Sequence, residues 1–285
     1  MATFTVGDIA PGTRLVDIAK QHLAVLPIDQ VGPLIAAGAI TINGETGAIN
    51  DLVRPGDLLA APTPLAAHVP APFPLAILDE DADLLVIDKP AGMHVHPLGA
   101  HRDGTLLNAL LWHAGARPDH PWAAYRPRPA HRLDRGASGL LLIAKHAAIH
   151  DALRTLLATH AIDRGYRATV HGLVTADTGT IDAPLGRDPS NDYRRAVIPT
   201  GQPAITHYRV VQRSAHPSSP TTLVDLTLAT GRTHQIRAHL ASLGHPILGD
   251  TLYGAAPLPG PAIALRAVTL RFSHPRDHTP RAWSI

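Results

Sequence analysis

Five prolines between residues 62 and 74 constrain the fold of this chain most strongly. Pro62, Pro64, Pro70, Pro72 and Pro74 alternate with alanine-rich stretches, which favours an extended, stiff segment over a helix or a central strand. Such a segment divides the 285-residue chain into unequal parts. The sequence therefore predicts a small domain at residues 1–62, a linker at 63–74 and a large domain at 75–285.

The small domain is predicted to contain two helices followed by a hairpin. Residues 14–26 have helical character before Pro27, and a second helix at 31–37 ends at Gly38. An alternating stretch then reaches Asn43-Gly44, a strong signal for a tight hairpin turn. The order, with "G-x-I-x-I-N-G" and "V-x-x-G-D", resembles an S4-type RNA-binding domain. Residues 1–65 hold six acidic and three basic residues, so this is an acidic, degenerate form of a domain that usually presents a basic helical face.

The large domain is predicted to be α+β with a mostly antiparallel sheet. Its second half is dominated by β signals, of which 222–229 is the clearest. There Val224, Leu226 and Leu228 face one way, and Asp225 and Thr227 face the other. Further strands are expected at 84–87, 139–144, 166–170, 205–211 and 263–272, and helices at 105–113, 149–157 and 233–243. Strands with few intervening helices favour an α+β fold.

Composition excludes several classes of function. The chain has no cysteine, which removes disulfides, thiolate catalysis and cysteine-based metal centres. No apolar run approaches the roughly 20 residues of a membrane span, and the first ten residues carry no basic residue, unlike a signal peptide. The sequence therefore predicts a cytoplasmic protein without a membrane partner. Of the 25 basic residues 22 are arginine; arginine suits phosphate and stacks on bases, although codon bias would give the same excess.

The segment 126–140 is the richest in candidate chemistry. Four arginines and His131 surround a single carboxylate, Asp134, directly before an apolar strand. A carboxylate among cations is held ionised and can act as a nucleophile or stabilise a transition state. The alternative is a surface turn with ion pairs worth about 0–1 kcal/mol each.

The segment 230–240 places a helix start next to basic residues. Gly231 permits a tight turn, and the helix that follows is expected to bury Ile236, Leu240 and Leu243. Its N-terminus, with Arg232 and Arg237, is predicted to bind an anion, either an RNA phosphate or a carboxylate such as Asp134. The alternative is an ordinary cationic helix face.

No metal site is predicted. His234 and His239 are five residues apart and have no acidic residue nearby, and His94 and His96 fit packing or surface positions better than a ligand pair. In the same segment as the latter pair, Lys89 follows a buried strand and could contact phosphate.

Taken in order, these segments resemble the RluA family of RNA pseudouridine synthases. The resemblance covers nearly all of residues 75–275. It is carried by "L-L-V-I-D-K-P-A-G-M-H-V-H-P" at 84–97, "G-T-L-L-N-A-L" at 104–110, "H-R-L-D-R-G-A-S-G-L" at 131–140, "R-G-Y-R-A-T-V-H-G" at 164–172, "G-Q-P-A-I-T-H-Y" at 201–208, "T-G-R-T-H-Q-I-R-A-H-L" at 230–240 and "L-G-H-P-I-L-G-D-T-L-Y-G" at 243–254. An N-terminal S4-like domain is common in one branch of the family.

The resemblance implies a pseudouridine synthase fold and a role for each matching residue. Asp134 would attack the target uridine at ribose C1′ or at base C6, and Arg237 would pair with it. Arg132 would enter the RNA helix and displace the target nucleotide. Tyr166 would stack on the uracil and assist proton removal from C5, and Leu265 would be an apolar contact in the pocket. The expected substrate is structured RNA, ribosomal or transfer, bound by a monomer without cofactor or metal.

Two further hypotheses compete with this one. A catalytically inactive RNA-binding protein could retain the fold, but the combination of Asp134, Tyr166 and Arg237 weighs against it. An aspartate-dependent glycosidase usually needs two carboxylates beside the bond, and the segment around Asp134 supplies no second acid.

Overall fold

The computed structural model describes residues 1–61, 69–98, 101, 103–117, 120, 122–216 and 218–285. The chain forms two compact units. The first comprises residues 1–86, 94–131 and 142–151, and the second comprises 87–93, 132–141 and 152–285. Residues 63–68 of the predicted linker lie outside the described part of the chain, and 69–75 form no helix or strand. A domain boundary at 63–74 therefore stays a prediction.

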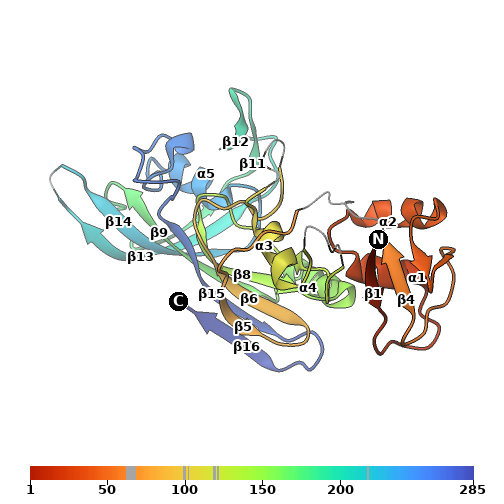
Figure 1. Cartoon of the computed structure of the whole chain (residues 1–285). Helices are drawn as coiled ribbons and strands as arrows, with labels where there is room; N and C mark the ends of the chain where they lie inside the picture. Colours follow the sequence, from red (N-terminus) through yellow and green to blue (C-terminus); the bar gives the residue numbers. More distant parts are fainter. Residues whose placement is uncertain (62–68, 99–100, 102, 118–119, 121, 217) are drawn as a thin grey trace. The chain divides into compact units, whose positions relative to one another are not determined.

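The first unit contains a small antiparallel sheet with two helices beside it (Figure 1). The strand order is β1-β4-β2-β3. The elements are β1 (Ala2–Thr5), α1 (Leu15–His22), α2 (Ile28–Ala36), β2 (Thr41–Ile42), β3 (Glu45–Thr46) and β4 (Leu58–Ala61). Asn43 and Gly44 both have positive φ, of 52° and 89°, as a type I′ turn requires. The predicted order of two helices and a hairpin is confirmed.

Residues 107–116 and 122–125 share a core with these N-terminal elements within the first unit. Leu111 and Trp122 are almost fully buried in one cluster with Leu15 and Leu59, and the Trp122 indole donates a hydrogen bond to the Ala2 carbonyl at 3.1 Å. The helix in this stretch is α3 (Leu106–His113). The first unit is therefore assembled from segments that are distant in sequence.

Arg126 closes the C-terminal end of α1. Its guanidinium donates to the carbonyl oxygens of Lys20, Leu23, Ala24 and Leu26 at 2.5 to 3.3 Å. The last carbonyls of a helix lack partners within the helix, and they carry its partial negative charge. The buried Arg126 supplies hydrogen bonds to these carbonyls and a positive charge next to the negative end of the helix.

Ten strands form one mixed sheet that is mostly antiparallel, as predicted (Figure 1). The order is β10-β13-β14-β9-β15-β8-β6-β5, with β16 paired to β15 and β7 paired to β8. Strand β15 pairs in parallel with β8 and antiparallel with β9. The bounds are β5 (Ala76–Glu80), β6 (Leu84–Lys89), β7 (Arg128–Pro129), β8 (Ser138–Ala144), β9 (Asp163–His171), β10 (Thr178–Asp182), β13 (Ile205–Ser214), β14 (Thr221–Leu228), β15 (Leu265–Ser273) and β16 (Pro280–Ser284).

The remaining elements are a hairpin and three helices. The hairpin pairs β11 (Leu185–Asp188) with β12 (Asn191–Val197) and projects from the second unit (Figure 1). The helices are α4 (Ala147–Ala158), α5 (Gln235–Ser242) and the short 3₁₀ helix η1 (Thr251–Tyr253). None of the helices in the described ranges is long and apolar enough to cross a membrane.

Helix α5 differs from the expected amphipathic pattern. Ile236 and Leu240 are buried as predicted, but Leu243 is 46% exposed, so its predicted burial is wrong. The helix ends at Ser242, and Leu243 lies beyond it as the C-cap. The buried positions include the polar residues Gln235, Arg237 and His239, because this helix serves a polar site as well as the core.

His239 makes the stability of the second unit sensitive to acid. Its ring is fully buried and contacts the Thr206 hydroxyl and the Ala183 carbonyl at 2.8 and 2.9 Å. Burial lowers the pKa of His239 below its ordinary value of 6.5, so the folded protein binds fewer protons than the unfolded chain. We expect the contribution of His239 to the free energy of unfolding to be constant above pH 6.5 and to fall below it, by at most about 1.4 kcal/mol per pH unit.

Urea unfolding of the wild type and of His239→Gln between pH 5 and 8 would measure this effect. Burial also lowers the pKa values of His22 and His234, so the variant is expected to lose only part of the pH dependence. Equal slopes for the two proteins below pH 6.5 would contradict the assignment to His239.

Candidate active site

Asp134 lies in a turn that is fixed by its neighbours in the second unit. Arg135 and Gly92 exchange two hydrogen bonds, at 2.7 Å from the Gly92 amide and 3.3 Å from the Arg135 side chain. The Gly136 carbonyl accepts from the Ile263 amide at 3.0 Å. Strand β8 then continues from the turn, and at Gly139 a Cβ would lie 2.2 Å from the Ala267 carbonyl oxygen. Glycine is required there because β8 and β15 approach so closely.

The start of α5 is built around the side chain of Gln235. Its amide oxygen accepts from the Thr230 hydroxyl and the Arg232 amide at 2.7 and 2.9 Å. Its amide nitrogen donates to the Ile205 carbonyl and the Thr206 hydroxyl at 2.9 and 3.0 Å. The helix start is thereby fixed to β13 and to the segment after β14, which sets where the first turn of the helix presents Arg237.

Arg237 joins two carboxylates. Its Nη1 donates to Asp134 Oδ2 at 3.1 Å, while its Nε and Nη2 donate to the two carboxylate oxygens of Asp250 at 2.7 and 2.8 Å. Asp250 is 1% exposed, whereas the Asp134 side chain is 16% exposed. The bidentate pair with Asp250 holds the guanidinium in place, and a donor on Nη1 orients the more accessible carboxylate of Asp134.

The charges around Arg237 explain its protonation. Burial alone would lower the pKa of Arg237, but the hydrogen bonds to Asp250 and the charges of Asp134 and Asp250 outweigh burial and raise it. Arg237 is therefore a permanent cation that lies between two carboxylates. The predicted pairing of Arg237 with a carboxylate of the 131–140 segment is present in the structure.

His234 and Tyr253 complete the polar side of the site. His234 Nε2 lies 3.9 Å from Asp134 Oδ1, and its ring meets Tyr253 edge to face. The guanidinium of Arg237 lies 5.1 Å from the centre of the Tyr253 ring. The Tyr253 hydroxyl accepts from the backbone amide of Arg195 at 3.0 Å and donates to its carbonyl at 3.1 Å. Tyr253 thus connects the site to strand β12.

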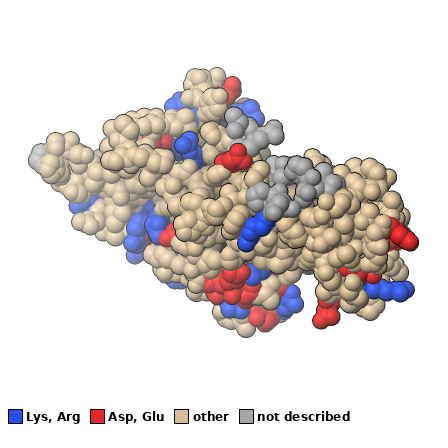
Figure 2. Space-filling view, viewed as in Figure 1, with Lys and Arg blue, Asp and Glu red and all other residues tan. Residues whose placement is uncertain are grey.

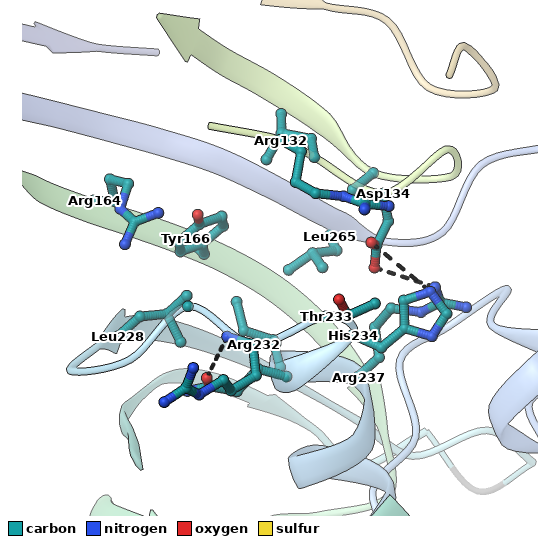
Figure 3. A pocket seen from close by; sticks show the side chains of 15 residues that line it. Arg132, Asp134, Arg164, Tyr166, Leu228, Arg232, Thr233, His234, Arg237 and Leu265 are labelled. Carbon is teal, nitrogen blue, oxygen red and sulfur yellow. Dashed lines mark hydrogen bonds and ion pairs between the residues drawn. The ribbon is translucent and has the colours of Figure 1, made fainter. Parts of the chain in front are cut away.

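Tyr166 and Leu265 form the apolar side of the same pocket (Figure 3). They lie on the paired strands β9 and β15, and each is 6% exposed. Burial, aided by the charge of Asp134, raises the pKa of Tyr166 against the opposing effect of Arg164, so its hydroxyl stays protonated at neutral pH. The pocket has a volume of about 100 Å³ and opens between Asp134 and these two side chains.

Two predicted RNA-contacting arginines lie at the edge of this pocket. Arg132 and Arg232 both line it and are exposed; Arg232 also donates from Nε to the Pro203 carbonyl at 3.2 Å. Arg135 belongs to the Asp134 turn, whereas Arg126 and Arg128 belong to the first unit. The four arginines that are close in sequence to Asp134 therefore do not act as one cluster.

Lys89 does not occupy the position predicted for it. Its side chain is completely buried, and the ammonium donates to the carbonyls of Pro90 and Met93 at 2.7 and 3.0 Å. Burial lowers the pKa of Lys89 to about 8, an effect that the charge of Asp134 partly opposes. A phosphate cannot reach this nitrogen, so the expected RNA contact is corrected to a structural role in the turn at 90–93.

No group of three or more histidine, aspartate or glutamate side chains is arranged to hold a metal ion within the described residues. The pocket instead presents one accessible carboxylate, a fixed cation, a neutral phenol and an apolar wall. This arrangement suits a carboxylate that acts on a molecule whose flat, uncharged ring lies against Tyr166 and Leu265.

Comparison with known proteins identifies the family. Residues 83–242, more than half of the chain, match the family described as RNA pseudouridylate synthase. The chain belongs to this family. It is an RNA pseudouridine synthase, an isomerase that converts uridine in RNA to pseudouridine.

Similar proteins cover nearly the whole synthase. It is 41% identical over 281 residues to the ribosomal large subunit pseudouridine synthase D of Zymomonas mobilis, covering 93% of this chain and 87% of the relative. The enzyme of the same name from Nitrosomonas europaea is 42% identical over 292 residues, covering 98% and 82%. An uncharacterized RNA pseudouridine synthase of Bacillus subtilis is 40% identical over 255 residues, covering 87% and 81%.

A solved structure supports the pseudouridine synthase fold. The human RNA pseudouridylate synthase domain containing 1 superposes with a TM-score of 0.61 at 24% identity, over 74% of this chain and 82% of that one. At this identity the likeness concerns the fold alone.

The structure also explains one departure from the family pattern and adds residues that sequence reasoning missed. Gly165 stands before Tyr166 where a larger residue is common in the family. A Cβ there would lie 2.1 Å from the Thr269 hydroxyl, so a larger residue at this position would require Thr269 to change its rotamer. Asp250 and Tyr253 lie in a motif that carried the resemblance, but nothing in their spacing indicates that they contact Arg237. The sequence raises His234 only in the question of a metal site and does not indicate its position 3.9 Å from Asp134.

Proposed function

We propose that this synthase isomerises uridines in the RNA of the large ribosomal subunit, with Asp134 as the nucleophile. The observation that supports the nucleophile is the hydrogen-bonded chain from Asp250 through Arg237 to Asp134, which ends at the one accessible carboxylate of the pocket. The support for the RNA class is the similarity to two enzymes named for the large subunit, each matched over more than four fifths of its length.

The residues of the pocket account for each stage of the reaction. The carboxylate of Asp134 attacks either ribose C1′ or base C6, and the bond between N1 and C1′ breaks. The uracil rotates and C5 bonds to C1′ as the bond to the carboxylate of Asp134 breaks. With the assistance of Tyr166 the C5 proton passes to water, and N1 takes a proton from water, so the net reaction is an isomerisation. Throughout, Arg237 orients the carboxylate, and Tyr166 and Leu265 enclose the uracil.

The target uridine must leave its stack to reach this pocket. Unstacking costs a few kcal/mol, which contacts to the displaced base and the backbone offset. Arg132 is exposed beside Asp134 (Figure 3) and fits the role of filling the space that the uridine vacates. Contacts to phosphate position the RNA, and contacts to the base select the uridine.

The same reasoning extends to the organisation of the enzyme. All residues of the pocket come from the second unit of one chain, which supports a monomer as the active form. The substrate implies action in the cytoplasm, where ribosomal subunits are assembled. The family match begins at residue 83, and the helices and hairpin before residue 62 support an S4-like domain there.

Tritium release from RNA labelled at uridine C5 tests the RNA class. We expect the purified enzyme to release tritium from a large-subunit ribosomal transcript and not from a pool of transfer RNA. Mapping pseudouridines in a deletion strain should show the loss of sites in the large-subunit RNA alone. Release from transfer RNA only would overturn the ribosomal assignment while leaving the isomerase activity intact.

A further inference from the structure

A second cavity lies beside the pocket of Asp134, between the β11–β12 hairpin and the turn that precedes α5. We name it the hairpin cavity. Its volume is about 400 Å³, and its walls include Arg187 and Arg195 from the hairpin and Arg232 from the turn. No aspartate or glutamate lines it. The hairpin cavity is therefore strongly cationic, and neither the catalytic chemistry nor the family match assigns it a role.

The two hairpin arginines, Arg187 and Arg195, are held next to each other at an energetic cost. They are direct cross-strand partners in the antiparallel register of β11 and β12, and like charges at such positions are destabilising. Of the two carboxylates on these strands, Asp188 is engaged by Arg194 and Ser190, and Asp192 is exposed near the turn of the hairpin. Among the described residues no carboxylate forms an ion pair with either hairpin arginine. The charge is thus available to an anion from outside the protein.

The backbone around the hairpin cavity is fixed. Leu185 and Gln202 exchange two hydrogen bonds of 2.9 Å, which form its floor. A Cβ at Gly201 would lie 2.5 Å from the Leu185 carbonyl carbon, so this close approach requires glycine. The Tyr253 hydroxyl also binds both backbone groups of Arg195. The guanidinium groups therefore project from a rigid frame, which lowers the ordering cost of binding.

The hairpin cavity and the catalytic pocket are neighbours. Gly231, Arg232 and Thr233 line both of them. Seen from outside, basic side chains flank the lobe that β11 and β12 form, with an acidic group at its tip (Figure 2). An anion in the hairpin cavity and a uridine bound at Asp134 would therefore contact the same short segment of the chain, Gly231 to Thr233.

We propose that the hairpin cavity binds a backbone phosphate of the RNA, next to the target uridine. This inference rests on the proposed function, because it places a second part of the same substrate. Arginine forks match phosphate oxygens in a bidentate manner, and the single negative charge of one phosphodiester offsets part of the charge of the three arginines. The phosphate relieves the repulsion between Arg187 and Arg195. The repulsion lowers the stability of the free enzyme, and its relief on binding adds to the affinity for RNA.

Charge-neutral substitutions of the hairpin arginines test the proposal. In steady-state assays on the labelled large-subunit transcript, Arg187→Gln and Arg195→Gln should each raise KM about tenfold, the loss of one charge-assisted contact. Because the phosphate is bound equally before and during the reaction, kcat should change less than threefold. In binding assays at several KCl concentrations, each variant should lower the slope of log affinity against log salt by about one.

The double variant and two controls sharpen the test. If both arginines bind one phosphate, their effects should not add, and the double variant should raise KM by less than the product of the single effects. Arg195→Lys, which keeps the charge but loses the fork, should fall between wild type and Arg195→Gln. Arg271→Gln removes the same charge from an exposed position on β15 and should leave KM within about twofold.

Thermal unfolding without RNA gives a readout of its own. Because substitution relieves repulsion between like charges, the melting temperatures of Arg187→Gln and Arg195→Gln should equal or exceed that of the wild type. Wild-type KM and salt slope in both variants would overturn the proposal, as would a fall in kcat at unchanged KM. These outcomes are read only against a wild type that releases tritium, and failure of the wild type would instead refute the proposed function.

Discussion

Asp134→Asn is expected to lose isomerisation by a factor on the order of 10⁴ or more while it still binds RNA. The amide keeps the shape of the carboxylate and can still accept a hydrogen bond from Arg237, but it is no longer an anionic nucleophile. Arg237 also keeps its bidentate partner, Asp250, so the fold should be preserved. Tritium release and filter binding on the large-subunit transcript measure the two properties separately.

Two further variants make this result decisive. Asp134→Ala guards against slow deamidation of asparagine to aspartate and should be equally inactive. Asp225→Asn is the matched control, because Asp225 is also held by arginines, Arg167 and Arg209, on the exposed face of β14; it should turn over within twofold of the wild type. Turnover of Asp134→Ala within a hundredfold of the wild type would show that another group attacks the uridine.

Asp250→Asn is expected to lower the free energy of unfolding by about 3 kcal/mol, because it leaves a buried guanidinium with one carboxylate where it had two. Asp250 is 1% exposed and binds Arg237 through both oxygens. Since Asp250 touches no substrate in the proposed reaction, it acts as a positioning residue. We expect kcat to fall at least tenfold with KM nearly unchanged, because Arg237 no longer holds Asp134 at the attacking angle.

Urea unfolding and steady-state kinetics at a temperature where the variant is folded measure both effects. Adding Arg237→Met to Asp250→Asn removes the uncompensated charge, and this double variant should recover much of the stability but none of the turnover. Asp225→Asn should cost less than about 1 kcal/mol, as expected for a partly exposed pair. A loss below 1 kcal/mol in Asp250→Asn, or a rise in KM with unchanged kcat, would contradict the positioning role.

The sequence predicts the elements whose pattern is local. The alternation at 222–229 marks β14, and the turn chemistry of Asn43-Gly44 marks the β2–β3 hairpin. The sequence does not predict the exposed edge strand β5 or the hairpin of β11 and β12. The side chains of these strands are not buried in regular alternation, so their sequences lack the alternation of apolar and polar residues that indicates a strand. Nor does the sequence show that residues 107–116 and 122–125 share a core with the N-terminal elements, because that depends on packing between distant segments.

The same limit applies to the site. Asp134 and Arg237 stand out in the sequence because they are charged residues next to apolar segments. In the structure, Arg237 Nη1 lies 3.1 Å from Asp134 Oδ2. Lys89 appears in sequence as a cation after a strand and gives no sign that its ammonium turns inward to bind Pro90 and Met93. Asp250 is 13 residues beyond Arg237, and only the path of the chain from the end of α5 to the residue that precedes η1 makes them partners.

The arginine that closes α1 has a consequence for how this enzyme could have been assembled from parts. Arg126 gives its donors to carbonyls at the end of an N-terminal helix, and Trp122 reaches the first strand of the chain. In a chain that began after residue 62, the polar groups of Arg126 and Trp122 would lose their hydrogen-bond partners. Their apolar parts would be exposed to water, and both changes would lower the free energy of unfolding. The N-terminal segment is thus not an interchangeable attachment. A lineage that lost it would also have to rewrite residues 106–126, and such paired changes would mark the event in related sequences.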